Sequence, residues 1–354
     1  MPIPIVMTAR EFKKRTTPKN IFKRHRGTLL TAIDTAMEGW ADGACPPDQK
    51  IPLLLLVVQA CRAWIDAKGH KTSENSEMRR GVIKELAGQA FERMQYEIFE
   101  SRKQNQPNVE TRGLQGTYRH ERTLYEQSGK TVAPSGTTVH FHVSHSHEYG
   151  LDVGGKSFDQ LTPQEFKALT DAIHARYNRP HGYMGEPSEV CFLKKSDRIK
   201  KLVVIENGFL YDGPQERLDH GDDQAAFVID EYGNLYCGLQ HIMERGMPSY
   251  QRFNHSTFNA GKDVICAGMI QVSQGRLKYI DNMSGHYKPT RTNLLNALQL
   301  LRDCGVDLYA NVKAGIAEPL NGPRGGKMVM KYYNNAAALL SHPNRPPDKT
   351  VDMD

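Results

Sequence analysis

The stretch FNHSTFNAGKDVICAGMIQVSQGRLKYIDNMSGHYKP, residues Phe253–Pro289, decides the fold of the second half of this chain. Its centre is an apolar run over 264–272, which is followed by Gly275 and by a second apolar run over 277–280. Two apolar runs of strand length on either side of a glycine are typical of a β-hairpin. Such a hairpin brings the two ends of the stretch close together.

The two ends of this stretch carry the candidate site of the chain. One end holds His255 beside two hydroxyl residues, and the other holds the sequence SGHY at 284–287. An imidazole changes its charge near neutral pH, which makes histidine the commonest general acid or base in enzymes. We therefore predict the following catalytic residues: His255, Ser284, His286 and Tyr287.

A second group of residues is predicted to bind the ligand. Its members are Arg217, Ser256, Thr257, Gly261 and Gly285. The hydroxyl groups supply hydrogen bonds, the glycines let a ligand approach the backbone, and the guanidinium clamps a phosphate or carboxylate. The alternative is structural: the histidines cap the ends of the hairpin, the tyrosine lies in the core, and Arg217 pairs with Glu216.

The first third of the chain has the periodicity of helices. An apolar run over 51–64 predicts a long helix, with Pro52 in its first turn. Residues 77–104 place apolar side chains at helical spacing between charged ones, which predicts an amphipathic helix. Together the two segments form a helical hairpin or a small bundle.

The second half has the pattern of strands. Short apolar runs separated by turn residues occur over 202–211 and 225–237, ahead of the 264–280 hairpin. An amphipathic helix over 290–304 follows, and Gly305 is suited to end it. The sequence therefore predicts an α+β fold, with an N-terminal helical hairpin or bundle followed by an antiparallel-sheet domain with packing helices.

Composition divides the 354 residues into segments and limits the class of protein. The predicted segments are a basic leader over 1–30, a helical domain over 31–105, a linker over 106–136, an α+β domain over 137–315 and a Gly/Pro-rich tail over 316–354. No run reaches the roughly 20 apolar residues of a membrane span, and no apolar segment of a cleaved signal peptide follows the first charges. The six cysteines form no CxxC pair, which indicates reduced thiols in a protein made in a cytoplasm.

The leader is the most basic part of the chain. It carries eight lysines and arginines against the single acid Glu11, within a net charge of +6 for the whole sequence. Such a run binds nucleic acid, an anionic lipid surface or an acidic protein, or it is a solvated segment without a partner.

A second histidine cluster lies over 140–147. His140 and His142 share one face of a strand, because side chains alternate with a period of two residues. Imidazoles on one face are a geometry that zinc accepts, with Glu148 or Asp152 to complete the shell. The alternative is a pair of half-buried strand histidines without a metal.

Several short motifs between residues 201 and 308 occur in a specific order. They are GPQER at 213–217, FVID at 227–230, HSTF at 255–258 followed by Gly261, and SGHY at 284–287 followed by Pro289. In this combination the region resembles a domain shared by plant IQ-motif calmodulin-binding proteins and by bacterial polymorphic toxins and secreted effectors. The chain departs from that family at Asn254 and Met269, where a histidine and an acidic residue are usual. No IQ-type motif is evident near the domain, so the resemblance does not imply calmodulin binding here.

The resemblance implies a secreted bacterial effector or toxin. Such a protein is made in the bacterial cytoplasm, is exported without a cleaved signal peptide, and acts on a target-cell protein or a nucleotide, with a cognate immunity or chaperone protein as a partner. The order of a His-Ser-Thr strand and a later His-Tyr pair is also similar to ADP-ribosyltransferases, which implies an NAD-dependent transferase with NAD as its cofactor. Those enzymes need a catalytic glutamate, and Glu318 is the one that follows the His-Tyr pair here.

Two other functions stay open at this point. In the first, the domain is a non-catalytic protein-interaction module and the SGHY segment is a structural corner. In the second, the protein is a zinc-dependent hydrolase whose metal is held at the 140–147 cluster.

Overall fold

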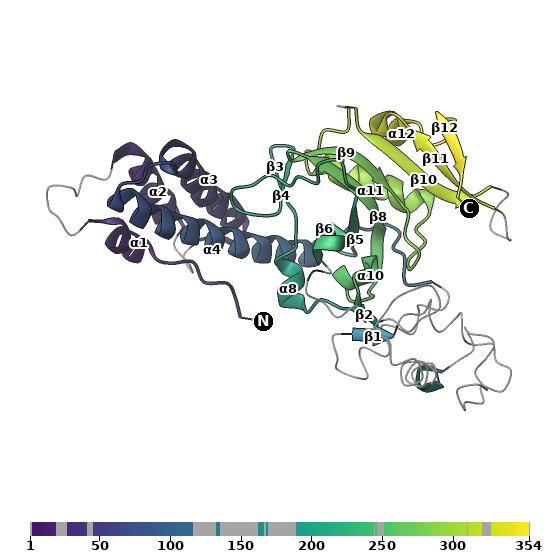
Figure 1. The fold of residues 1–354 in the computed structure, drawn as a ribbon, viewed down its shortest axis with the longest axis horizontal. Helices are drawn as coiled ribbons and strands as arrows, with labels where there is room; N and C mark the ends of the chain where they lie inside the picture. Colours follow the sequence, from purple (N-terminus) through teal and green to yellow (C-terminus); the bar gives the residue numbers. More distant parts are fainter. Residues whose placement is uncertain are drawn as a thin grey trace. The chain divides into compact units, whose positions relative to one another are not determined.

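The computed structural model describes residues 2–18, 27–40, 45–115, 132–134, 162–165, 168, 189–243, 245, 251–309, 311–320 and 327–353. Backbone contacts divide the chain into two units. The helical unit contains residues 1–105, 202–204 and 210–218, and the sheet unit contains residues 106–201, 205–209 and 219–354. Helices come first and a mainly antiparallel sheet follows (Figure 1), so the predicted α+β fold is confirmed.

The helical unit is a bundle of four α-helices among the described residues. They are α1 (Ala9–Thr16), α2 (Gly27–Gly39), α3 (Lys50–Lys68) and α4 (Glu74–Gln104), with the short 3-10 helix η2 (Pro47–Gln49) ahead of α3. α3 packs against α2 and α4, and α1 packs against α2 and α4. The buried residues Leu54, Val57, Val58 and Cys61 recur at helical spacing along α3, as the sequence periodicity predicts.

Part of the basic leader is a packed helix. The Thr8 hydroxyl caps α1 by accepting a hydrogen bond from the Glu11 N–H, and the Phe12 side chain is fully buried. Two of the cations are paired within the helical unit, Lys13 with Glu38 and Arg15 with Glu85, at 2.5 Å each. These pairs are half exposed and contribute little stability, about 0–1 kcal/mol each. They also leave less unpaired positive charge on α1 than the sequence indicates.

The sheet unit is built on a seven-stranded sheet in the order β12-β11-β10-β9-β8-β5-β6. Its strands are β5 (Ala225–Asp230), β6 (Leu235–Gly238), β8 (Val264–Ser273), β9 (Arg276–Asp281), β10 (Lys313–Pro319), β11 (Met328–Tyr333) and β12 (Lys349–Asp352). All neighbouring strands are antiparallel except β9 and β10. A parallel pair needs a crossover connection, and α11 (Arg291–Asp303) lies in that connection.

The central hairpin of this sheet is the predicted one. β8 and β9 are joined at Gln274 and Gly275, which have φ angles of 49° and 77°. Two successive left-handed residues form the tight turn that suits the twist of a hairpin. Its register places Gln271 opposite Tyr279 and Ile270 opposite Ile280, with an irregularity after Gln271.

α11 covers one face of the sheet, as Figure 1 shows. The Thr290 hydroxyl accepts a hydrogen bond from the Asn293 N–H at its start, and Gly305, with φ of 90°, follows its end. Its buried side chains are Leu294, Ala297, Leu298 and Leu301, which is one apolar face of a helix. The predicted helix over 290–304 is therefore confirmed.

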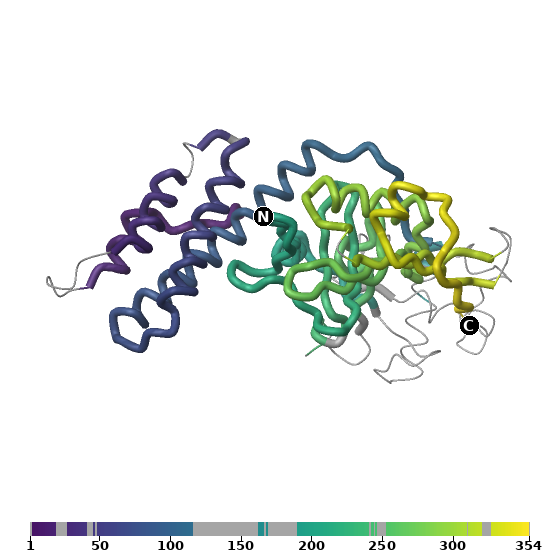
Figure 2. The backbone as a smooth tube through the Cα atoms, turned by 90° about the horizontal axis from the view of Figure 1, so that it is seen from above, coloured from purple at the N-terminus to yellow at the C-terminus, as the bar shows by residue number. Residues whose placement is uncertain are grey.

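Residues 316–354 contribute secondary structure where the sequence predicts a tail. They contain most of β10, β11 and β12, together with α12 (Ala336–Ser341), which packs against α11 and β10. Figure 2 shows this yellow end of the chain folded beside the green strands. The segment boundaries drawn from the sequence stay predictions.

The remaining elements are short. They are β1 (Val132–Pro134), β2 (Glu189–Cys191), α8 (Lys195–Ile199), β3 (Val204–Glu206), β4 (Phe209–Tyr211), α9 (Gln240–Met243), β7 (Gln251–Arg252) and α10 (His255–Phe258). β1, β2 and β7 form a three-stranded sheet, and β3 pairs with β4. Among the described residues, no helix has both the length and the apolar character that a membrane crossing requires.

Candidate functional site

α10 carries the first three residues of the candidate site. The sequence HSTF was expected to be a strand, as in ADP-ribosyltransferases, but it forms one helical turn. The Thr257 hydroxyl accepts a hydrogen bond from the Asn254 N–H at 2.9 Å, which caps this turn. Phe258 anchors the turn in the core, where its ring packs edge-on against Phe253 with the centroids 4.8 Å apart. A local cap and one buried ring therefore outweigh the strand-like composition.

His255 is bonded to the central strand of the sheet. Its Nε2 lies 2.9 Å from the carbonyl oxygen of Gly268 in β8. A carbonyl can only accept, so Nε2 carries the proton in this arrangement. Burial lowers the pKa of His255 to about 4, although the hydrogen bond to Gly268 opposes this change. The imidazole is therefore neutral at pH 7.

His286 is bonded to the hydroxyl of α10. Its Nδ1 lies 2.9 Å from Ser256 Oγ, and both side chains are buried. Burial, with a smaller contribution from the neighbouring His255, lowers the pKa of His286 to about 3. The two ends of the hairpin stretch thus converge through a hydroxyl and two neutral histidines.

The SGHY segment is a tight turn after β9. The Lys288 N–H donates to the carbonyl oxygen of Ser284 at 2.8 Å, and the Tyr287 N–H donates to Ser284 Oγ at 3.4 Å. Tyr287 is fully buried, and its hydroxyl donates to the carbonyl oxygen of Lys262 at 2.9 Å. Gly285 is exposed at the tip of the turn, with open space where a Cβ would lie.

A buried carboxylate next to this turn was not predicted. Asp281 ends β9, and its Oδ1 accepts hydrogen bonds from the N–H groups of Met269 at 2.7 Å and Met283 at 2.8 Å. Its Oδ2 accepts from the Tyr279 hydroxyl at 2.9 Å. Burial raises the pKa of Asp281 to about 6, while these hydrogen bonds lower it. The signal in the sequence is an acid at the end of an apolar strand, in the same hairpin as Gly268.

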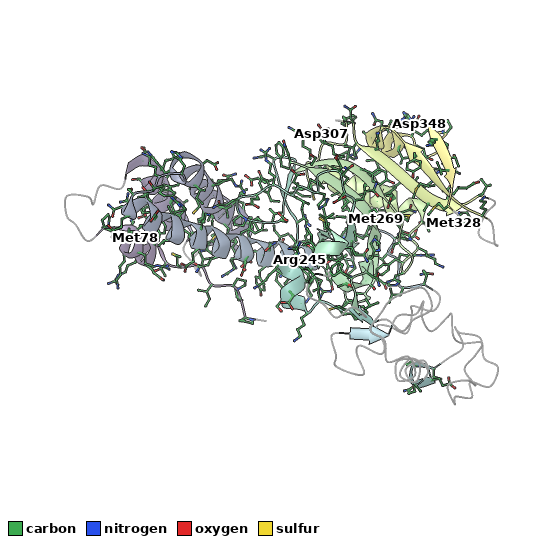
Figure 3. All side chains as sticks on the ribbon, viewed as in Figure 1. Met78, Arg245, Met269, Asp307, Met328 and Asp348 are labelled. Atoms are coloured by element: carbon green, nitrogen blue, oxygen red, sulfur yellow. The ribbon has the colours of Figure 1, made fainter. Side chains whose placement is uncertain are left out.

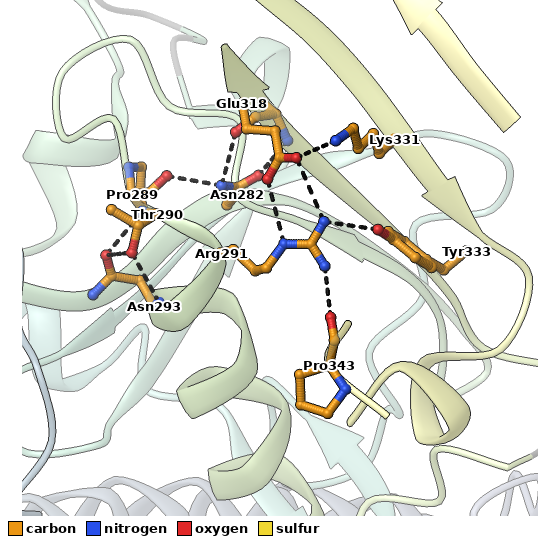
Figure 4. A network of polar contacts seen from close by, with 10 residues as sticks. Asn282, Pro289, Thr290, Arg291, Asn293, Glu318, Lys331, Tyr333 and Pro343 are labelled. Atoms are coloured by element: carbon orange, nitrogen blue, oxygen red, sulfur yellow. Dashed lines mark hydrogen bonds and ion pairs between the residues drawn. The ribbon is translucent and has the colours of Figure 1, made fainter. Parts of the chain in front are cut away.

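Glu318 lies in β10 and is held by two cations (Figure 4). Its carboxylate contacts the guanidinium of Arg291 at 3.3 Å and Lys331 Nζ at 2.5 Å. Burial raises its pKa, but the hydrogen bonds from Lys331 and Arg291 outweigh burial, so the pKa of Glu318 lies below its ordinary value. The glutamate needed by an ADP-ribosyltransferase is therefore already occupied by ion pairs.

The other predicted site residues belong to the helical unit or lie outside the described residues. Arg217 belongs to the helical unit, where its Nε donates to the Tyr211 hydroxyl at 3.4 Å. Its role as an anion clamp stays a prediction. His140 and His142 lie outside the described residues, and so does the rest of the 140–147 cluster. Among the residues that are described, no group of three or more His, Cys, Asp or Glu side chains could hold a metal ion.

The HSTF and SGHY residues lie in a region of the chain that matches a known protein family. Residues 197–294 match the family model of the IQ motif-containing protein middle domain. The matched range includes α10, the central hairpin and the SGHY turn. This region resembles a plant domain. The resemblance to plant IQ-motif proteins is therefore confirmed. The resemblance to bacterial toxins and effectors is supported by none of these matches.

The similar curated proteins are from Arabidopsis thaliana. The IQ domain-containing protein IQM2 is 30% identical over 161 residues, which is 38% of this chain and 25% of that protein. IQM3 is 39% identical over 91 residues, 25% of this chain and 18% of its own length, and IQM1 is 32% identical over 126 residues, 35% and 24% respectively. The match thus spans about a quarter of these relatives or less. No solved structure matches the chain.

These relatives overturn the functional prediction. A secreted bacterial effector or toxin with a transferase site was expected, made in a bacterial cytoplasm and exported. The similar proteins are plant IQ domain-containing proteins, so that prediction is wrong, as are the bacterial location and export. The immunity or chaperone partner was implied only by the toxin resemblance, so it is no longer expected. That prediction rested on the bacterial part of the motif resemblance, whereas the catalytic and ligand-binding roles of the HSTF and SGHY residues stay predictions.

Proposed function

We propose that the sheet unit is a non-catalytic protein-interaction module in which the HSTF and SGHY motifs hold the fold together. The observation that carries this proposal is the hydrogen bonding of the motif side chains. His255, Ser256, His286 and Tyr287 each bond to another group of the same unit. An effective acid or base has a pKa near the working pH, whereas the two histidines have pKa values of about 4 and about 3.

The similar proteins support a protein partner for this module. Their printed names describe them as IQ domain-containing proteins, and the matched part is a middle domain. The one Ile-Gln pair of this chain is Ile270-Gln271, which lies in β8 with Ile270 fully buried. Calmodulin targets bind as amphipathic helices laid into a groove, and a central strand cannot do so. We therefore propose that the partner is bound by the folded surface of the module rather than through this pair.

A ligand screen tests the non-catalytic part of the proposal. Wild type and His286→Gln are heated with NAD, ATP and Zn²⁺, since a ligand that binds the native state raises the melting temperature. We expect the same melting temperature for each protein with and without ligand. An NAD-dependent increase in wild type that His286→Gln lacks, or transfer of ADP-ribose by wild type alone, would overturn the proposal.

A capture experiment tests the interaction part. The full chain is immobilised, and proteins that cross-link to the sheet unit are identified by mass spectrometry, with His342→Ala as a control because His342 is exposed. We expect the same cross-linked proteins with wild type, the control and folded His286→Gln. Capture that is lost in folded His286→Gln but kept in the control would place the SGHY turn in a binding site and contradict a structural role.

A further inference from the structure

A hollow of about 900 Å³ lies on the sheet of the sheet unit. Residues of β8, β9, β10, β11 and β12 line it, together with the loop before β5. The lining residues that matter here are Asp222, Lys278, Tyr279, Lys313, Tyr332 and Lys349. This hollow does not include the HSTF and SGHY side chains, so it is a surface separate from the cluster described above.

Strand register shows which face of the sheet the hollow occupies. Tyr279 is paired with Lys313 between β9 and β10, and Tyr332 is paired with Lys349 between β11 and β12. Paired residues point to the same face, and successive residues point to opposite faces. The hydroxyl of Tyr333 accepts a hydrogen bond from Arg291 of α11, so Tyr333 points toward the helix. Tyr332 therefore faces away from α11. Because Gly315 of β10 is paired with Tyr332, the register places Lys313, Tyr279 and Lys349 on that same face.

Positive charges outnumber negative ones among the described residues that line the hollow. Lys278, Lys313 and Lys349 form no ion pair with any residue that the structure describes, and Asp222 is the one acid in the lining. Two lysines outside the lining are paired, Lys331 with Glu318 and Lys327 with Asp352. Three unpaired cations on one concave surface attract an anionic partner and raise its rate of association.

An acid near these strands is already neutralised. Asp348, which precedes β12 (Figure 3), contacts Arg345 at 3.3 Å. Its other oxygen accepts a hydrogen bond from the Asn334 N–H at 2.7 Å. Asp348 therefore fixes the connection between β11 and β12 and is not a counter-ion for the lysines of the hollow.

The width of the hollow suits a short extended peptide as the bound partner. Five adjacent strands at a spacing of about 4.8 Å span about 19 Å, which is the length of about six residues of extended chain. The amide side chains of Gln271, Asn311 and Asn334 also line the hollow, and each can both donate to and accept from a peptide backbone. Because these amides match the donors and acceptors of a peptide backbone, we take the anionic partner to be a peptide with carboxylate side chains and not a nucleic acid.

We propose that this hollow binds an acidic, extended segment of a partner protein. The inference rests on the proposed function, because it names where the interaction module holds its partner and by what chemistry. Lysine ammonium groups meet the carboxylates, and the half-buried ring of Tyr332 contacts the apolar parts of the segment.

A labelled acidic hexapeptide tests this proposal. The probe is Glu-Asp-Tyr-Glu-Asp-Glu with a fluorophore, and its binding to the full chain is followed by fluorescence anisotropy at low and physiological salt. We expect binding that weakens with salt, and at least a tenfold loss of affinity in the double variant Lys313→Glu/Lys349→Glu. Both lysines are exposed, so the double variant is expected to keep its melting temperature. The control Lys288→Glu alters an exposed lysine of the same unit outside the hollow and is expected to stay within twofold of wild type.

Three results would overturn the proposal. They are equal affinity in the double variant and wild type, equal loss in the control, and tighter binding of a single-stranded oligonucleotide of the same charge that the double variant also loses. If the hexapeptide fails to bind while protein capture persists in the double variant, the hollow is wrong as the docking site but the interaction module stands. An NAD-dependent shift in melting temperature would instead remove the proposed function itself.

Discussion

Ser256 and His286 lie thirty residues apart in the sequence, and Ser256 Oγ is 2.9 Å from His286 Nδ1. This contact joins α10 to the SGHY turn. The residue before Ser256, His255, joins the same helical turn to Gly268 in β8. Helix, turn and strand are therefore connected by two neutral, largely buried imidazoles, in a part of the molecule where the sequence alone predicts catalysis.

Removing this contact is predicted to destabilise the sheet unit. His286→Ala deletes a buried ring and leaves the Ser256 hydroxyl without this partner, so we expect a loss of about 2–4 kcal/mol in the free energy of unfolding. Both tryptophans lie in the helical unit, so unfolding of the sheet unit is best followed by hydrogen exchange of peptides from 264–281. His342→Ala, at an exposed position, is expected to change stability by less than about 0.5 kcal/mol. Equal stability of His286→Ala and wild type would show that the contact is not structural.

The lowered pKa values of His255 and His286 predict acid sensitivity. In the unfolded chain a histidine takes up a proton near pH 6.5, whereas the pKa values of folded His255 and His286 are about 4 and about 3. Between these values the unfolded chain holds more protons, so stability is full above about pH 6.5 and falls as the pH is lowered. At about pH 5 each histidine should cost about 2 kcal/mol relative to neutral pH.

The carboxyl group of Asp281 changes stability with pH in the opposite direction. Its contribution must therefore be separated from that of the histidines. Its folded pKa of about 6 lies above the unfolded value, so the folded state holds more protons between them and acidification stabilises it through this group. Comparing urea unfolding of wild type and His286→Gln near pH 7.5 and pH 5 cancels the Asp281 contribution. The variant should show about 2 kcal/mol less dependence on pH than wild type. Identical pH profiles would mean that His286 is not held neutral by the fold.

The parts of the fold that local pattern determines were predicted. The apolar runs and the turn at Gly275 predict the β8–β9 hairpin, and helical spacing predicts α3, α4 and α11. β10 could not be predicted in the same way, because its sequence KAGIAEP is rich in small residues and ends in proline. Its strand conformation comes from partners distant in sequence, among them the Tyr279 side chain, which occupies the space where a Cβ of Gly315 would lie.

The meeting of the two ends of the hairpin stretch could be predicted, whereas the catalytic and ligand-binding roles given to its residues stay predictions. The convergence of His255, Ser256 and the SGHY turn follows from hairpin geometry, and the structure contains it. Whether those groups face solvent or bond to one another depends on the packing of α10 and on Asp281, which carry no distinctive motif. Histidine and serine occur both in catalytic sites and in buried, hydrogen-bonded turns. A sequence pattern alone therefore does not distinguish the two.

Two glycines near the cluster are predicted to differ sharply in their tolerance of a methyl group. A Cβ at Gly268 would clash with the carbonyl oxygen of Asp281, so Gly268→Ala must displace a central strand. A Cβ at Gly285 meets no atom within 4 Å. We expect Gly268→Ala to cost about 3 kcal/mol or more and Gly285→Ala to cost less than about 0.5 kcal/mol. Thermal unfolding of both variants decides this, and strong destabilisation by Gly285→Ala would show that the tip of the turn is packed.

The last prediction concerns the ion pairs around Glu318. Arg291 is the first residue of α11, where a cation is disfavoured by the helix dipole by about 0.3–1 kcal/mol. Its guanidinium is held by Glu318, by the hydroxyl of buried Tyr333 at 2.8 Å and by the carbonyl oxygen of Pro343 at 2.7 Å (Figure 4). Glu318 thus stabilises a charge that the helix end alone would not.

Glu318→Gln removes the negative charge but keeps the shape, and we expect it to lower the free energy of unfolding by about 1–2 kcal/mol because two partly buried cations lose their counter-ion. Since the pKa of Glu318 is lowered in the folded state, this contribution is full above the ordinary glutamate pKa and is lost as the pH falls below it. The control is Asp352→Asn, which breaks the exposed Lys327–Asp352 pair and should cost less than about 0.5 kcal/mol. Equal effects of the two variants in urea unfolding near neutral pH would mean that the Glu318 network contributes no more than a surface ion pair.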